Sequence, residues 1–237
     1  MKNTLFVTIL MFAVLVFSCK KETTEPVNPE PPIPQSSNKW FSVTDSTKVY
    51  FSHGNLQYEA LSDIWKFAEN QWDTNVGDGW SNLLNWRNYD SVVDNYRNMT
   101  KDEWLYVLET RNTNSGTRYA KAQLNGINGM ILLPDGWDNR IYELNEINIY
   151  TADYPSNVID STLWESTMEP QGAVFLPASG YRIGEDVYGM VDYGYYWTAT
   201  GYNDSWAYYW RFGIHFYETN KGPRGYGLAV RLVCDAE

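Results

Sequence analysis

The stretch Gly194-Tyr195-Tyr196-Trp197-Thr198-Ala199-Thr200 decides the fold class of this chain of 237 residues. It combines aromatic and threonine side chains after a glycine, which is a composition typical of a β-strand. Two more strand-like runs follow it, at residues 207–214 and 227–233. The C-terminal part of the chain therefore predicts a group of strands.

Aromatic residues are concentrated around this strand, with 13 aromatic side chains in the 30 positions of residues 188–217. Successive residues of a strand point to opposite faces. The even-numbered residues of the run 208–212 then share one face that is entirely aromatic, and we expect this face to be buried. Tyr209 and Arg211 share the other face, which we expect to be exposed to solvent.

Earlier parts of the chain predict a mixture of helices and strands. Short strand-like runs lie at residues 48–52, 64–68, 129–134 and 173–177. Thr100 and Glu103 have the spacing of a helix capping box, and apolar residues follow at helical intervals as far as Arg111. A second short helix is expected over residues 163–168, and residues 73–99, rich in Asn, Asp and Gly, are expected to form an ordered loop region. These elements predict a single α+β domain over residues 39–237.

The first 38 residues predict export and a lipid anchor. An uncharged run, residues 5–17, has the length of the apolar region of a signal peptide and is shorter than the roughly 20 residues of a membrane-spanning helix. The residues around Cys19 resemble the site at which bacteria acylate a cysteine and cleave before it. We therefore expect residues 1–18 to be a signal peptide, Cys19 to be lipidated and residues 19–38, rich in proline, to be a tether. The alternative is an ordinary signal peptide that contains a cysteine.

The expected location follows from this anchor and from the charge of the chain. A lipidated chain would lie on the bacterial outer membrane, with its domain on the cell surface or facing the periplasm. The formal net charge of −11 argues against nucleic acid as a partner, because the chain repels phosphates. Only two cysteines are present, Cys19 and Cys234, so the sequence predicts no disulfide framework.

Several short motifs occur in a characteristic order along residues 40–234. They are Phe51-Ser52-x-Gly54-Asn55-Leu56-Gln57-Tyr58, residues 65–72, Thr100-x-x-Glu103-Trp104-x-Tyr106, residues 131–134, Phe175-Leu176-Pro177-Ala178-x-Gly180-Tyr181-Arg182, residues 194–200 and residues 227–233. This order resembles the fibrobacter-type major paralogous domain of bacterial surface lipoproteins, a group related to the formylglycine-generating enzymes. The resemblance implies a C-type-lectin-like fold with short strands, about two helices and long ordered loops.

The same resemblance bears on activity. Formylglycine-generating enzymes use a reactive pair of cysteines that binds copper, and this domain contains only Cys234. We therefore expect no such activity, and no other catalytic signature is present in the sequence. Other proteins of this fold bind ligands through their C-terminal strands, and some of them diversify these positions. Because several aromatic and acidic residues do not fit such diversification, we expect a fixed binding face for a glycan or a protein.

The candidate ligand-binding residues lie on the C-terminal strands and their loops. They are Tyr202, Asn203, Asp204, Trp206, Tyr209, Arg211, His215, Tyr217 and Arg224. No cofactor is expected, although the acid pairs Asp73/Asp78 and Asp135/Asp138 leave a structural calcium ion open. Two alternative functions also remain, a structural component of a surface assembly and a glycan hydrolase whose paired carboxylates the sequence does not reveal.

Overall fold

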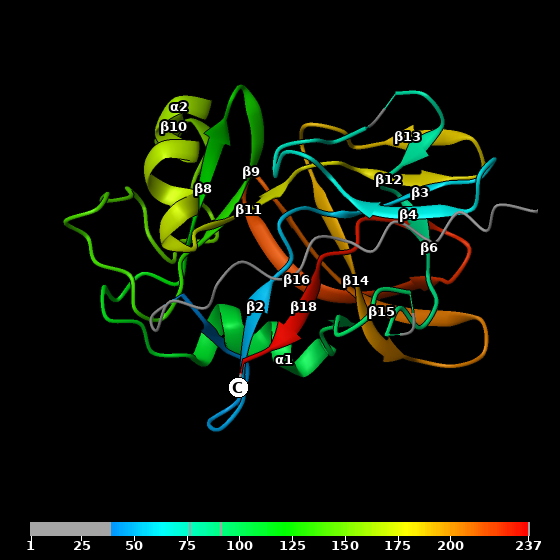
Figure 1. The fold of residues 1–237 in the computed structure, drawn as a ribbon, viewed down its shortest axis with the longest axis horizontal. Coiled ribbons are helices and arrows are strands. Elements are labelled where there is room, and N and C mark those ends of the chain that lie inside the picture. The colour runs from blue at the N-terminus through cyan, green and yellow to red at the C-terminus, as the bar shows by residue number, and fades with distance from the viewer. Residues whose placement is uncertain (1–38, 76, 91, 237) are drawn as a thin grey trace, which may run out of the picture.

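The computed structural model describes residues 39–75, 77–90 and 92–236 of the chain (Figure 1). The expected signal peptide, the lipidation site at Cys19 and the tether all lie outside these residues. Strands outnumber helices and belong to several small sheets, which confirms the α+β class. In the described ranges, no helix is both long enough and apolar enough to cross a membrane.

Five small sheets contain the strands. In spatial order, the first sheet contains β1 (Phe41–Ser42), β2 (Lys48–Phe51), β18 (Leu232–Asp235) and β7 (Arg97–Asn98), and the second contains β10 (Val158–Ile159), β8 (Tyr119–Leu124), β9 (Ile127–Leu132) and β11 (Val174–Pro177). The third sheet contains β13 (Asp186–Tyr188), β12 (Tyr181–Ile183), β17 (Gly227–Leu228) and β6 (Leu84–Asn85). The two three-stranded sheets contain β14 (Gly194–Gly201), β15 (Trp206–Gly213) and β16 (Phe216–Pro223), and β4 (Ile64–Phe67), β3 (Leu56–Glu59) and β5 (Trp80–Ser81). In Figure 1 the sheet of β8 to β11 and the sheets that contain β3 and β12 lie on opposite sides of the molecule, with β14 to β16 between them.

Both expected helices are present, and each changes character along its length. Helix α1 (Lys101–Leu105) begins at Thr100, whose side chain accepts from the Glu103 amide while the Glu103 side chain accepts from the Thr100 amide. It continues as the π-helical segment η1 (Tyr106–Thr110). Helix α2 (Ser161–Leu163) likewise continues as the π-helical segment η3 (Trp164–Met168). Two single 3-10 turns, η2 (Tyr154–Ser156) and η4 (Glu169–Gln171), complete the helical structure that the model describes.

The C-terminal strands differ from the expectation in two ways. Strand β16 was not expected, yet it pairs with β15 along its whole length, from Phe216 opposite Gly213 to Pro223 opposite Trp206. The run 227–233, expected to be one strand, is divided between β17 and β18 and contributes to two different sheets. The residues between β17 and β18 are nevertheless buried. The whole run therefore crosses the core, which accounts for its mostly apolar residues.

The core confirms the buried half of the alternation expected for β15. Trp210 and Phe212 are fully buried, and Tyr208 on the same face is half-buried. The Trp210 ring lies 4.8 Å from that of Trp104 on α1 and is stacked with Tyr196 of β14 at 5.5 Å. These contacts fix the β14–β16 sheet against α1. On the opposite face, Trp197 is fully buried, and Tyr209 and Arg211, which were expected to be exposed, are half-buried, because this side of the sheet packs against a second hydrophobic cluster.

Candidate functional site

The β14–β16 sheet divides the predicted ligand-binding residues between its two faces. Arg211 lies opposite Glu218 in the register, while Phe212 lies opposite Tyr217. Tyr217 therefore shares the face of Phe212, and its ring contacts that of Tyr119 at 5.5 Å. Tyr209 and Arg211 lie on the other face. The single surface expected from the sequence is thus corrected to two separate surfaces, because neighbouring positions on paired strands alternate between faces.

Six tyrosines gather on the face of Tyr209, and we call them the tyrosine surface. They are Tyr181, Tyr188, Tyr193, Tyr195, Tyr209 and Tyr226. Tyr181 is at their centre, with its ring 5.5 Å from Tyr188, 4.8 Å from Tyr195 and 6.3 Å from Tyr226. Tyr188 is 44% exposed, Tyr195 is buried and the other four are half-buried. The rings are therefore contiguous, and five of the six are at least partly accessible to solvent.

Two features hold Tyr209 flat against the sheet. Its ring packs 5.9 Å from Trp197, which is buried beneath it. On the other side it crosses β16 at Gly222, where an added Cβ would come within 3.0 Å of the tyrosine ring. Burial raises the pKa of Tyr209 and of Tyr195 above the ordinary value of 10.0. Both phenols therefore keep their O–H donors at neutral pH.

A charged pair borders the tyrosine surface. Arg211 forms a salt bridge with Glu218 across β15 and β16 and donates a hydrogen bond of 3.1 Å to the Tyr195 hydroxyl. Its guanidinium carbon lies 5.0 Å from the centre of the Phe216 ring. Glu218 is exposed, so its second oxygen faces solvent next to the aromatic rings. The border therefore offers polar groups in fixed positions beside a stacking surface.

Five predicted residues lie together at the far end of the hairpin that joins β14 and β15. They are Tyr202, Asn203, Asp204, Trp206 and Arg224. The amides of Tyr202 and Asn203 both donate to the Trp206 carbonyl, and the Asn203 side chain accepts from the Trp206 amide. The Arg224 guanidinium lies 4.0 Å above the Trp86 ring. Arg224 is half-buried and the other four are exposed, so these five form one group within the larger surface that the sequence predicted.

His215 lies apart from the other candidates. It belongs to the turn between β15 and β16, which is at the opposite end of β15 from Trp206. Its ring Nδ1 is 3.3 Å from the Thr151 carbonyl oxygen. Five members of the tyrosine surface were not among the predicted binding residues, and three of these, Tyr181, Tyr188 and Tyr226, reach it through the pairing of β12 with β13 and β17. No local pattern in the sequence signals that pairing.

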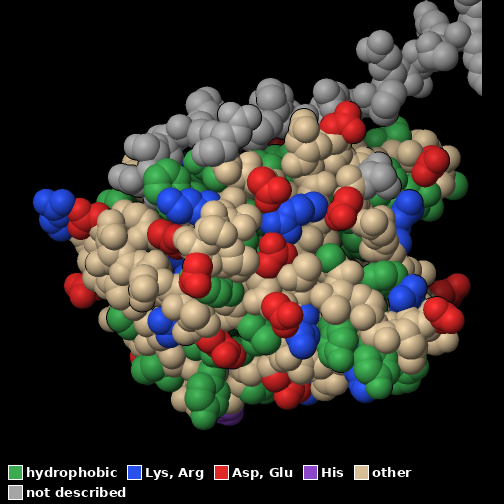
Figure 2. Space-filling view, turned by 90° about the horizontal axis from the view of Figure 1, so that it is seen from below, with side chains coloured by type: hydrophobic (Ala, Val, Ile, Leu, Met, Phe, Trp, Pro, Cys, Tyr) green, Lys and Arg blue, Asp and Glu red, His purple; other side chains and the backbone are tan. Residues whose placement is uncertain are grey.

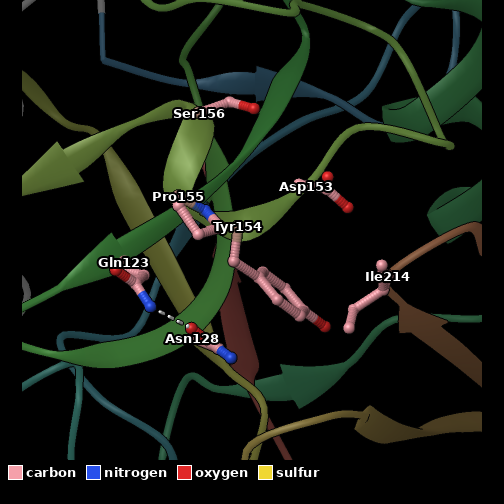
Figure 3. Close-up of a pocket in the computed structure, with 7 residues that line it drawn as sticks. All are labelled: Gln123, Asn128, Asp153, Tyr154, Pro155, Ser156 and Ile214. Atoms are coloured by element: carbon pink, nitrogen blue, oxygen red, sulfur yellow. Dashed lines mark hydrogen bonds between the residues drawn. The ribbon is translucent and has the colours of Figure 1, made fainter.

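A pocket of about 550 Å³ opens near the turn between β15 and β16 (Figure 3). It is lined by Gln123, Asn128, Asp153, Tyr154, Pro155, Ser156 and Ile214. Figure 3 shows the hydrogen bond of 2.9 Å from the Gln123 amide to Asn128 at one side of it. Asp153 is the single carboxylate among these lining residues. Because glycosidases use two carboxylates across the substrate, this pocket does not support the hydrolase alternative.

A buried lysine lies beside this pocket. Lys121 on β8 is fully buried, and its ammonium donates to the carbonyl oxygens of Tyr150 and Gly213. It is 6.0 Å from the centre of the Tyr154 ring. Burial lowers the pKa of Lys121 from 10.5 to about 8, although Asp153 opposes the change. Lys121 therefore ties the β15–β16 turn to β8 at the cost of a buried charge.

This cost predicts a pH dependence of stability. Between pH 8 and pH 10.5 the unfolded chain keeps the Lys121 proton while the folded chain releases it, so the free energy of unfolding should rise with pH in this window. From pH 7 to pH 9.5 the gain from this residue should be about 2 kcal/mol. Urea denaturation across this range should show that the free energy of unfolding rises more in the wild type than in Lys121→Met. The variant is the control, because Cys234 and the tyrosines titrate in both proteins. Parallel profiles for the two proteins would contradict the assignment.

The calcium ion that the sequence left open has no cluster of acids to support it among the described residues. Asp135 accepts hydrogen bonds from Ser42 and from the buried Arg111, and Asp138 is bonded to Arg140. Among residues 39–75, 77–90 and 92–236, no group of three or more His, Cys, Asp or Glu side chains is placed to hold a metal ion. Calcium binding stays a prediction of the sequence.

Comparison with known proteins gives one family match. A model of a domain of unknown function, DUF8237, matches residues 151–233. This segment, less than half of the chain, contains β14 to β16 and all six members of the tyrosine surface. We found no match among curated proteins and none among solved structures.

Proposed function

We propose that this protein is a non-catalytic binding protein that holds a glycan on its tyrosine surface. The continuous contact of six tyrosine rings on one side of the β14–β16 sheet carries this proposal. Sugar rings present C–H groups that pack on aromatic faces, and aromatic side chains bind at a low cost in conformational entropy. The phenols, together with Arg211 and Glu218, supply hydrogen-bonding groups at fixed positions around the rings.

The setting of this site is also a proposal. The order of the motifs along residues 40–234 and the α+β class support a C-type-lectin-like fold. The uncharged run at residues 5–17 and the residues around Cys19 support a lipoprotein on the outer membrane, with its domain displayed on the cell surface. A glycan-binding domain on a lipid anchor would hold its ligand close to the cell.

The proposal predicts loss of glycan binding when Tyr209 loses its ring. The full-length chain should bind members of an array of neutral oligosaccharides and mucin glycans. Tyr209→Ala should weaken this binding by more than roughly tenfold, as for an interface hot spot. Tyr209→Phe, which keeps the ring and removes the hydroxyl, should retain most of the affinity.

A matched control is available on another surface. Tyr106 is also half-buried and hydrogen-bonded, to Asp45, but it lies on η1 away from the β14–β16 sheet. Tyr106→Ala should leave binding unchanged. If Tyr209→Ala bound the glycan with the affinity of the wild type, the tyrosine surface would not be the binding site. A folded wild type that binds no glycan would overturn the proposal and direct the search to a protein ligand.

A further inference from the structure

The opposite face of the same sheet contains a row in which two lysine side chains flank two tyrosine rings. We call it the lysine–tyrosine row, and it consists of Lys101, Tyr208, Tyr202 and Lys221. The Lys101 ammonium lies 5.1 Å from the centre of the Tyr208 ring, and the Lys221 ammonium lies 3.7 Å from the centre of the Tyr202 ring. The two rings meet edge to face at 5.7 Å. Four side chains from α1, β15, β16 and the hairpin thus form one contiguous group.

The backbone holds this row in place. Lys221 lies directly opposite Tyr208 in the register of β15 and β16. The Lys101 amide donates to the Thr200 hydroxyl at 3.0 Å, which fixes the start of α1 beside the hairpin. The Thr198 hydroxyl donates to the Tyr208 carbonyl at 2.9 Å, where the register of β14 and β15 shifts. The backbone that carries these side chains is therefore ordered before a ligand binds, which reduces the conformational entropy lost on binding.

The lysines of the row keep their positive charge available. Within the described residues, no carboxylate oxygen lies within 4.0 Å of the Lys221 ammonium. Lys101 is 3.4 Å from Asp102, whose side chain is 86% exposed, and such a pair is weak in water. An aromatic ring attracts an ammonium without neutralising it and accepts no conventional hydrogen bond. Both lysines therefore retain donors for an anion.

From this arrangement we infer a second site on the lysine–tyrosine row, which binds an anionic polysaccharide that bears sulfate or carboxylate groups. The ammonium groups bind the anions, and Tyr202, which is 49% exposed, packs against the adjoining sugar rings. A polysaccharide supplies both kinds of group in alternation along its length. A nucleic acid duplex fits less well, because its bases are stacked inside the helix and leave Tyr202 no exposed ring to pack on.

Charges of both signs are mixed on one face of the molecule. Figure 2 shows that acidic and basic side chains are mixed over short distances on the face seen from below, without a broad area of one charge. Asp204 lies exposed in the hairpin loop next to Tyr202 and would repel an anion. Asp204→Asn should therefore strengthen binding to this site. The same change should leave binding of a neutral glycan to the tyrosine surface unaltered.

Calorimetric titration of the full-length chain with dextran sulfate, polygalacturonate and neutral dextran tests this site. At least one of the two anionic polymers should bind, and neutral dextran should not bind at this site. Lys221→Ala and Lys101→Ala should each weaken binding at least roughly tenfold, the effect of losing one charge-assisted hydrogen bond. Lys48→Ala is the matched control, because the Lys48 ammonium also lies over an aromatic ring, that of Trp40 at 4.1 Å, but belongs to another sheet.

The outcomes separate this site from the tyrosine surface. Tyr209→Ala should bind the anionic polymer as well as the wild type does, whether or not the protein binds neutral glycans. Unchanged affinity in Lys221→Ala and Lys101→Ala would overturn the inference. Equal binding of a short DNA duplex or of anionic lipid vesicles would also overturn it, since the row would then recognise charge alone.

Discussion

Arg231→Ala is expected to lower the free energy of unfolding by about 3–5 kcal/mol, because it removes three buried hydrogen bonds from a charged donor, which contribute about 1.5 kcal/mol or more each. Arg231 is fully buried between β17 and β18. Its guanidinium donates to the Ser52 carbonyl and the Gln71 side chain, each at 3.1 Å, and to the Phe175 carbonyl. The substitution removes the guanidinium donors from these acceptors and opens a cavity where three segments of the chain meet.

Urea denaturation at pH 7 measures this effect. Burial lowers the pKa of Arg231 to about 10, so the residue is still charged at that pH. Arg231→Lys should also be destabilising, because one ammonium does not reproduce the planar arrangement of guanidinium donors. Arg140→Ala is the control, since its side chain is 90% exposed, and it should change stability by about 0.5 kcal/mol or less. A loss in Arg231→Ala no larger than in this control would refute the structural role.

Trp210→Ala is expected to cost about 3–5 kcal/mol of unfolding free energy, the usual range for removing a buried tryptophan. Trp210 is fully buried and packs between Trp104 on α1 and Tyr196 on β14. The large ring joins the helix to the sheet that holds both proposed sites. Denaturation followed by circular dichroism measures the loss without depending on tryptophan fluorescence.

The same strand provides the control for this experiment. Trp206 begins β15 and is 40% exposed, so Trp206→Ala should cost at most about 1 kcal/mol. The substitution removes the same side chain from the same strand and differs in burial alone. Similar losses in the two variants would show that the contact between α1 and the sheet contributes little.

Features with a local cause were predicted well from the sequence. The capping box at Thr100 depends on residues three positions apart, and the helix begins there. The alternation that buries Trp210 and Phe212 is a property of one extended strand. In each case the residues that determine the structure are neighbours in the chain, so their pattern is visible without the fold.

Features that depend on distant pairing were not predicted. Strand β16 is mostly polar and ends in Gly222-Pro223, and it is held by its pairing with β15 rather than by an apolar face. The tyrosine surface needs Arg182 of β12 to pair with Gly227, which brings Tyr181 next to Tyr226. Sequence reasoning identified Tyr209 and the hairpin residues but assigned Tyr217 to the wrong face of the sheet.

The position of β18 has a consequence for the order in which the molecule assembles during translation. This strand lies between β2 and β7, where Val233 is opposite Phe51 and Leu232 is opposite Asn98. Both neighbours leave the ribosome long before residues 232–235 do. The growing polypeptide therefore carries two unpaired strand edges until this late segment emerges, and such edges invite association between nascent chains. A chaperone that shields β2 and β7 during this interval would protect the protein at its most vulnerable stage.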